Sequence, residues 1–494
     1  MIYDLVIYGG TSAGVAAAVQ AKRMGLQPIV IEPGRRLGGL SSGGLGDTDF
    51  GNKGAIGGLA LEFYKRLGEK YGGAEAAWLF EPKMALAVFQ DWVAEHDIEV
   101  IYEQRLDRKA GVIRADRRIC SIRMESGISF EGRMFMDASY EGDLMKEAGV
   151  SYATGREANQ VYGERYNGIQ TATAVKNQLP PGIDPYRIPG QPSSGLLPGV
   201  NADAGGADGD GDHQIQAYCY RMCLTDAPDN RVMIERPDGY DEQMYELMFR
   251  AIEQGEDRFF KLNGVPNRKT DSNNDRGFST DFIGYNYDYP EADYETRERI
   301  AAAHKRHQLG LVWTLQNHPR VPEHIRSFYQ PWGLPLDEFE ETGHWTPQLY
   351  IREARRMVAD TVMNENHIFR RLPVADSIGM GAYTMDSHNT QRHVNNDGWV
   401  VNEGDVQIKL DGPYPISYRS IVPKEEECTN LLVPVCLSAS HIAYGSIRME
   451  PVFMVLAQSA ATAAAMAIEQ NIHVQQVDYG ALSKRLTEDG QVLQ

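Results

Sequence analysis

The sequence predicts an α/β protein in which a doubly wound nucleotide-binding domain carries a separate, inserted α+β domain. Three observations support this fold class. A short apolar strand, a glycine-rich turn and a helix of small residues open the chain between Asp4 and Met24. A long glycine-rich loop follows the second predicted strand, at residues 33–46. The middle of the chain, residues 156–345, is richer in Pro, Gly, Asn and Asp than the more regular segments on either side.

The length and net charge of the chain exclude some classes of protein. The chain has 494 residues, enough for more than one domain, and 42% of them are apolar. Its formal net charge is -19, and such an acidic surface repels nucleic acid and anionic lipid. No signal-peptide pattern precedes the first strand, and no apolar run approaches ~20 residues. We therefore expect a cytoplasmic protein that binds neither nucleic acid nor a membrane.

The residues that could hold a metal or a disulfide are sparse. Five cysteines in a chain of this length form no disulfide framework, and Cys219 and Cys223 lack a second ligand pair for zinc. Residues 208–212 (Asp-Gly-Asp-Gly-Asp) resemble the start of a calcium loop. His213 stands where that loop needs glycine, and Cys219 stands where it needs glutamate. We expect a solvated loop and no metal site.

The first βαβ unit indicates a dinucleotide site. Gly9 permits the tight turn after the strand, Gly14 lets the helix pack closely, and the helix N-terminus attracts a pyrophosphate. Thr11 replaces the middle glycine of the usual G-x-G-x-x-G pattern, so its side chain must either stand clear of the phosphates or donate its hydroxyl. Glu32 ends the second strand, where the ribose hydroxyls need an acceptor. The predicted cofactor contacts in the turn are Gly9, Gly10, Thr11, Ser12, Ala13 and Gly14.

The loop after Glu32 distinguishes FAD from NAD. A plain NAD domain continues into its next helix at this point, whereas residues 33–46 contain six glycines that let backbone run close to an extended cofactor. The predicted contacts are Pro33, Gly38, Gly39, Leu40, Ser41, Gly43 and Gly44. Several short β-like runs within residues 99–137 then predict a meander.

Several blocks together resemble a known family. They are Gly9–Gly14, Leu37–Gly44, Asp137–Asp143, Gln348–Arg356, Asp386–His388 and Ser438–Pro451. The chain resembles, over nearly its whole length, FAD-dependent oxidoreductases with a glutathione reductase-type fold, which are distantly related to fumarate reductase and succinate dehydrogenase flavoproteins.

The resemblance implies a Rossmann-like FAD-binding domain split by an inserted substrate domain. Residues 1–155 would form its first part, residues 156–345 the insertion, and residues 346–494 a return that completes it. Ala138 and Ser139 would also contact FAD. In the return, residues 430–436 read as a buried strand and residues 453–469 as an alanine-rich helix.

Two subclasses of flavoprotein can be tested from the residues. A disulfide reductase needs a cysteine pair early in the chain, but the first cysteine is Cys120. The nearest second dinucleotide motif, Gly379–Gly381, has Thr384 in its last glycine position, so no pyridine nucleotide domain is expected and the electron acceptor is unknown. Fumarate reductase relatives attach FAD to a histidine in the early glycine-rich loop. This loop holds serines and glycines instead, so we expect non-covalent FAD.

The remaining chemistry needs a proton-transfer group and a cation near the flavin. The candidates are His441, Arg448 and His388, because the resemblance places the block after residue 436 beside the flavin ring. Alternatively, His441 only caps the turn and Arg448 only bridges to Glu450. Arg352 and Arg356 lie in a run that reads as helical from about Pro347, and salt bridges explain them slightly better than substrate contact.

These features predict an FAD-dependent dehydrogenase or oxidase that transfers a hydride between flavin and a small polar substrate, such as a sugar or sugar acid. One alternative is reduction of an activated C=C bond with an external electron donor. Another is a structural or binding protein that merely carries the flavin.

Overall fold

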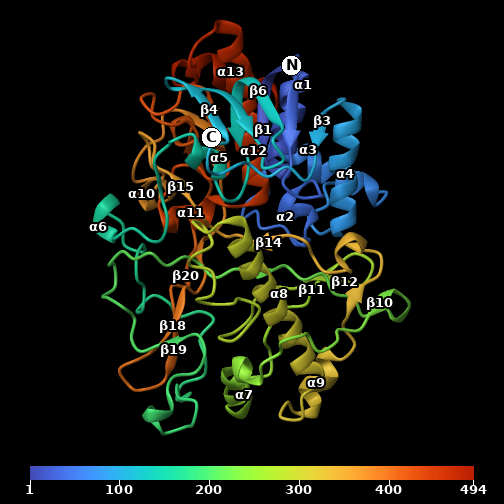
Figure 1. Cartoon of the computed structure of the whole chain (residues 1–494), viewed down its shortest axis with the longest axis vertical. Coiled ribbons are helices and arrows are strands. Elements are labelled where there is room, and N and C mark those ends of the chain that lie inside the picture. The colour runs from blue at the N-terminus through green and yellow to red at the C-terminus, as the bar shows by residue number, and fades with distance from the viewer.

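The computed structural model describes residues 1–494 and has a mixed α/β fold. Its main sheet has the strand order β3-β2-β1-β6-β5-β4, with β22 paired to the end of β6 (Figure 1). Strands β1, β2, β3, β22 and β6 run parallel, and β4 and β5 form an antiparallel meander with β6. The bounds are β1 (Ile2–Tyr8), β2 (Pro28–Ile31), β3 (Glu99–Ile101), β4 (Val112–Ala115), β5 (Arg118–Arg123), β6 (Ser129–Asp137) and β22 (Leu431–Leu432). The meander predicted within residues 99–137 is thus confirmed for β4 to β6, whereas β3 joins the opposite edge.

Alternating side chains of the buried strands supply two apolar cores. Leu5 and Ile7 of β1 belong to the larger core, while Val6 and Tyr8 face a smaller one on the other side of the sheet. Helices of the larger core cover one face: α1 (Ser12–Arg23), α3 (Gly58–Lys70), α4 (Pro82–Glu95) and α12 (Glu450–Gln470). The smaller core includes α5 (Asp143–Glu147) and β22, so both ends of the chain contribute to one sheet.

Helix α12 is long and apolar enough to cross a membrane by length and composition alone, with a mean hydropathy of 1.6 over its best window. The expectation that no apolar run approaches such a length was therefore wrong. However, 94% of that window is buried inside the protein, where alanines let α12 lie close against α1. Burial of this kind identifies α12 as a core helix.

The second part of the molecule lies below the sheet in Figure 1 and is built mainly from the middle of the chain. Its helices are α7 (Glu246–Glu253), α8 (Tyr294–Asn317) and α9 (Glu323–Tyr329). Its short strands are β8 (Val200–Asn201), β9 (Cys219–Tyr220), β10 (Arg231–Val232), β11 (Asn263–Val265), β12 (Lys269–Asp271) and β13 (Leu334–Pro335). Strand β8 pairs with β18 (Gln391–Val394), which in turn pairs with β19 (Val400–Glu403), so the predicted third segment contributes to both parts.

The remaining helices and strands are mostly short. The helices are α2 (Gly39–Ser42), α6 (Asn159–Tyr162), α10 (Glu365–Ile368), α11 (His441–Ile447) and α13 (Tyr479–Glu488). The strands are β7 (Tyr152–Ala153), β14 (Leu349–Tyr350), β15 (Arg356–Met357), β16 (Ser377–Gly381), β17 (Met385–Ser387), β20 (Val406–Ile408) and β21 (Tyr414–Ser417).

The predicted helical run after Pro347 is wrong. The chain forms β14, an irregular stretch and then β15, because its buried side chains find ionic partners in other segments. Arg352 pairs with Asp281, Arg355 with Asp143, and Arg356 with Glu157. The salt-bridge interpretation of these arginines is confirmed. The stretch Asp208–Asp212 forms no helix or strand and is mostly exposed, as expected of a solvated loop.

Candidate functional site

The turn between β1 and α1 requires its glycines. Gly9 has a φ of +104°, and a Cβ there would lie 2.8 Å from the carbonyl carbon of Ala138. A Cβ on Gly14 would lie 1.9 Å from the carbonyl oxygen of Gly9. Thr11 caps α1: its hydroxyl accepts from the amide of Gly14 at 3.2 Å and donates to the carbonyl of Ala138 at 2.8 Å. The Thr11 hydroxyl therefore bonds to protein and occupies the amide of Gly14, while the positive end of the α1 dipole still faces the turn.

Glu32 closes the far side of this turn. Its carboxylate accepts hydrogen bonds from the amides of Gly10 at 2.7 Å and Gly34 at 2.6 Å. Burial raises the pKa of Glu32 to about 7, although both amide donors oppose that rise. Glu32 thus directly follows β2 beside the nucleotide turn, the position expected of an acceptor for the ribose.

A buried carboxylate of α12 joins the turn to the glycine-rich loop. Glu450 accepts from the hydroxyls of Ser12 at 2.5 Å, Ser41 at 2.9 Å and Tyr140 at 2.7 Å. The Tyr140 hydroxyl also accepts from the amide of Leu40 at 2.9 Å, and a Cβ on Gly39 would clash with that hydroxyl. Sequence reasoning assigned no site role to Tyr140 or Glu450, because only the fold brings these segments together.

A cavity of about 280 Å³ lies against the turn, Glu32 and the loop. Six of the predicted cofactor residues line it: Gly9, Thr11, Glu32, Pro33, Gly39 and Ser139. Gly10, Ser12, Ala13, Gly14, Gly38, Leu40, Ser41, Gly43, Gly44 and Ala138 lie in the same turn, loop or strand end without lining it. Glycine backbone without side chains, the N-terminus of α1 and the acidic Glu32 after β2 together suit the ADP half of a dinucleotide.

A second cavity, of about 140 Å³, lies close by and is almost entirely polar. Every lining residue except Met449 carries a hydrogen-bonding side chain, and we call it the polar cavity. Its lining residues are Asp47, Asp49, Asn177, Arg221, Lys261, Asn263, Asn273, Asn274, Tyr350, Tyr383, Asp386, His388, Gln407, Arg448 and Met449. His388 and Arg448 are thus brought together here, whereas His441 does not line this cavity.

One strand separates the two cavities. Gln348 lines the nucleotide cavity and Tyr350, two residues further along, lines the polar cavity. The segment that leads into α12 also connects the two cavities. Arg448 and Met449 line the polar cavity, and Glu450, the next residue, binds the nucleotide turn. A cofactor whose ADP half occupies the first cavity would therefore have the second cavity next to it.

Five side chains of alternating charge form a row that ends at one wall of the polar cavity, where His388, Asp386 and Arg448 line it. Arg352 donates to Asp281 at 2.8 Å, and Asp281 accepts from His388 Nδ1 at 2.9 Å. His388 Nε2 lies 3.4 Å from Asp386, which lies 3.7 Å from Arg448. The aspartate at Nδ1 fixes the orientation of the imidazole and leaves Nε2 at the cavity.

The charges around His388 decide its proton affinity. Burial and the nearby Arg352 lower the pKa of His388, but Asp281 and Asp386 raise it by more, so the net direction is upward. The same contacts hold the pKa of Asp386 below its ordinary value, despite burial. Next to a cavity, a histidine with a raised pKa between two carboxylates can exchange a proton near neutral pH.

Arg448 is held beside the cavity rather than paired with Glu450. Its guanidinium donates to the Tyr350 hydroxyl at 2.6 Å and to Gln216 Oε1 at 3.1 Å, while its Nε has no partner. The alternative in which Arg448 only bridges to Glu450 is wrong, because Glu450 binds Ser12, Ser41 and Tyr140 instead. A buried donor without a partner is rare and is suited to receiving a ligand oxygen.

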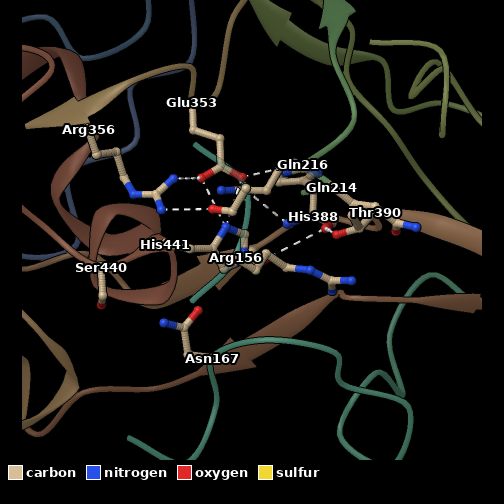
Figure 2. A network of polar contacts seen from close by, with 12 residues as sticks. Arg156, Asn167, Gln214, Gln216, Glu353, Arg356, His388, Thr390, Ser440 and His441 are labelled. Atoms are coloured by element: carbon tan, nitrogen blue, oxygen red, sulfur yellow. Dashed lines mark hydrogen bonds and ion pairs between the residues drawn. The ribbon is translucent and has the colours of Figure 1, made fainter. Parts of the chain in front are cut away.

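His441 lies behind this wall, in the network shown in Figure 2. It is the first residue of α11, is 2% exposed, and its Nδ1 lies 2.8 Å from Glu353 Oε1. Ser440, rather than His441, caps the helix. Glu353 also accepts from the backbone amide of Gln216, whose side chain contacts both His388 and Arg448. The other ring nitrogen of His441, Nε2, lies 3.2 Å from the hydroxyl of Ser387, so His441 is connected to the cavity through Glu353, Gln216 and Ser387.

Sequence reasoning missed most of the polar cavity. Asn263, Asn273 and Asn274 fall in a stretch whose high content of Asn, Asp and aromatic residues was the only signal. Asp47 and Asp49 follow directly after the glycine-rich loop, yet nothing in their spacing marked them. Arg221 is bound to Asp271 by two contacts of 2.7 Å, a pairing that no local pattern shows.

Comparisons with known proteins agree with this geometry. A family model described as FAD dependent oxidoreductase matches residues 4–486. No match was found among curated proteins.

Similar solved structures include L-proline dehydrogenase from P. horikoshii, L-amino acid deaminase from Proteus vulgaris and the flavin-dependent brominase Bmp2. They are 14%, 12% and 16% identical to this chain over 32%, 31% and 32% of its length, at TM-scores of 0.25, 0.26 and 0.25. The matches span 58%, 52% and 42% of those chains, and similarity at this level says nothing about the substrate.

Proposed function

This chain belongs to the FAD-dependent oxidoreductase family, and on that premise we propose that it oxidises a small polyhydroxylated substrate, such as a sugar or sugar acid. It acts as a dehydrogenase or oxidase, with non-covalently bound FAD. The observation that carries this proposal is the polar cavity beside the nucleotide cavity, because its lining offers hydrogen bonds in every direction and almost no apolar surface.

The lining chemistry favours a neutral or weakly charged polyol. Asparagine side chains can both donate and accept. Both arginines there are already paired, Arg448 with Asp386 and Arg221 with Asp49 and with Asp271 behind the lining. Hydroxyl groups, which also donate and accept, satisfy such a lining better than an apolar ligand does. A site built to hydrogen-bond hydroxyls also rejects analogues that lack them.

His388, Asp281 and Arg448 have different roles in the proposed reaction. Bound FAD supplies the acceptor for a hydride from the substrate C–H bond. His388 Nε2 takes the proton of the adjacent hydroxyl, while Asp281 holds Nδ1 and stabilises the imidazolium that forms. Arg448, which lines the polar cavity, binds the oxygen that becomes a carbonyl.

The test is anaerobic mixing of the purified holoenzyme with a panel of sugars, sugar acids, amino acids and hydroxy acids. The proposal expects bleaching of the flavin absorbance by members of the first two classes. Bleaching by amino acids or hydroxy acids alone would overturn the substrate class. Reoxidation of chemically reduced enzyme by an activated alkene, with no bleaching by any polyol, would favour the C=C reductase instead.

We expect denaturation to release the flavin from the protein. The loop at residues 33–46 holds no histidine or cysteine for attachment. Acid or heat precipitation should therefore leave FAD in the supernatant, identified by its fluorescence before and after phosphodiesterase treatment. Flavin that stays with the precipitated chain would contradict non-covalent binding, and recovery of FMN would contradict the dinucleotide.

Glu32→Ala should weaken FAD binding by about 1–3 kcal/mol, because a charged acceptor for the ribose is lost. The substitution also frees the amides of Gly10 and Gly34. Fluorescence titration of the apoprotein with FAD measures the dissociation constant, and Glu103→Ala, at an exposed position beyond the loop, serves as the matched control. An unchanged constant in Glu32→Ala would show that the acid does not contact the ribose.

The rate of flavin reduction should rise with pH. Oxidation needs neutral His388, and the two aspartates hold its pKa above the ordinary value of about 6.5. The imidazole is therefore increasingly protonated, and inactive as a base, as the pH falls through that raised pKa. Stopped-flow reduction between pH 5.5 and 9 should show one ionisation above about 6.5. A midpoint below 6 would argue against His388 as the base.

A further inference from the structure

A larger cavity adjoins the polar cavity. It encloses about 700 Å³, compared with about 140 Å³ for the polar cavity. The irregular segment of residues 171–181 forms one wall, and the β18–β19 hairpin with its turn forms the other. We call it the outer cavity. None of the residues so far placed at the cofactor or at the polar cavity lines it.

The lining of the outer cavity combines one flat aromatic surface with neutral polar groups. Trp399 is partly exposed there, next to Asn395 and Asn396 in the hairpin turn. Asp203 is the one carboxylate among the lining residues, and no lysine or arginine lines the cavity. An indole face contacts the C–H side of a sugar ring while amides bind its hydroxyls, so this lining suits an uncharged sugar.

Consecutive residues form the partition between the two cavities. Asn177 lines the polar cavity and Gln178 lines the outer cavity. Asn177 has a φ of +48° and donates to Asp405, while the amide group of Gln178 and the backbone of Asn402 exchange two hydrogen bonds, at 2.8 and 2.9 Å. Neighbouring residues of one segment therefore line the two cavities.

Two buried polar atoms on the outer cavity's wall have no partner. They are Nδ1 of His393, a residue 6% exposed, and Oδ1 of Asn402, a residue 2% exposed. Buried polar groups are nearly always satisfied, so this wall has unused hydrogen-bonding capacity. Burial lowers the pKa of His393, so its imidazole is neutral near pH 7 and pairs with a hydroxyl rather than with an anion.

We propose that the outer cavity binds a second sugar unit of the substrate, so that the enzyme acts on the end of an oligosaccharide or glycoside rather than on a free monosaccharide. The inference rests on the proposed function, because the reacting unit must occupy the polar cavity. Trp399 supplies the platform for the second unit, and Asn177 with Gln178 marks the position of the glycosidic link.

The experiment compares chain lengths. FAD-replete enzyme is mixed anaerobically with mono-, di- and trisaccharides of glucose, galactose, mannose and xylose, and kcat/KM is obtained from flavin reduction. For the reactive sugar, the disaccharide should exceed the monosaccharide by about tenfold or more, as expected for one added stacking contact. Trp399→Ala should abolish this difference while monosaccharide kcat/KM stays within about twofold. Trp332→Ala, at a partly exposed tryptophan outside both cavities, is the matched control and should preserve the difference.

Several results would overturn the proposal. Equal kcat/KM for mono- and disaccharides is one, and an equal loss for both in Trp399→Ala is another. If no sugar bleaches the flavin, the proposed function fails, and calorimetric titration with the trisaccharides then decides about the cavity. Binding by the wild type that Trp399→Ala weakens about tenfold or more supports a sugar-binding outer cavity, whereas no such binding refutes it.

Discussion

His388→Asn is expected to slow substrate-driven flavin reduction by about 10²-fold or more, the typical loss for a general base. Asparagine keeps a hydrogen-bonding side chain beside Asp281 but cannot accept a proton. FAD content should stay near wild type, because His388 lines the polar cavity and not the nucleotide cavity. The measurement is single-turnover flavin reduction, at equal FAD occupancy, over the pH range used for the wild type. The rise of the rate with pH should disappear in this variant.

Variants of two further histidines supply a control and a test of the alternative base. His473→Asn removes a histidine that pairs with Glu425 away from both cavities, and its reduction rate should equal that of the wild type. His441→Asn disturbs the Glu353–Gln216 connection, so it should reduce the rate less than His388→Asn while keeping the pH dependence. If His441→Asn has the larger effect and His388→Asn reduces near the wild-type rate, His441 is the base and the assignment is reversed.

The parts of the fold that follow from local pattern could be predicted. The β1–α1–β2 unit needs glycines where a Cβ would meet backbone, and those glycines are visible in the sequence. Alanine-rich α12 and the buried strand β22 also follow from composition, although only two residues of the predicted strand 430–436 pair with β6. Such elements depend on neighbours within a few residues.

The polar cavity could not be predicted, because its residues meet only through long-range packing. Asp281 and His388 are 107 positions apart, yet they form the contact that gives His388 its role. The same reason explains the wrong helix after Pro347. Its arginines at i,i+4 spacing suggested one helical face, but carboxylates from other segments pair with these arginines and draw the chain into an extended path.

Glu450 shows how this distant packing also assembles the nucleotide site. Its carboxylate is 3% exposed and lies in the first turn of α12, where the helix dipole favours negative charge. Each of its three donors comes from a different segment: α1, α2 and the strand end after β6. One residue near the C-terminus therefore fixes the relative positions of the turn and the loop that face the cofactor.

Glu450→Ala should lower the free energy of unfolding by about 3–5 kcal/mol, since three hydrogen bonds to a buried acceptor are lost and three hydroxyls are left without it. FAD affinity should fall as well, because the turn and α2 lose their common anchor. Urea unfolding of the apoprotein measures the first effect, and FAD titration measures the second. Glu450→Gln, which keeps the volume and one acceptor oxygen, should show a smaller loss of both. Glu469→Ala, at the exposed far end of the same helix, is the matched control and should change neither quantity.

If Glu450→Ala unfolds at the wild-type urea concentration and binds FAD normally, the carboxylate does not hold these segments together. The nucleotide site would then be ordered by the glycine contacts alone.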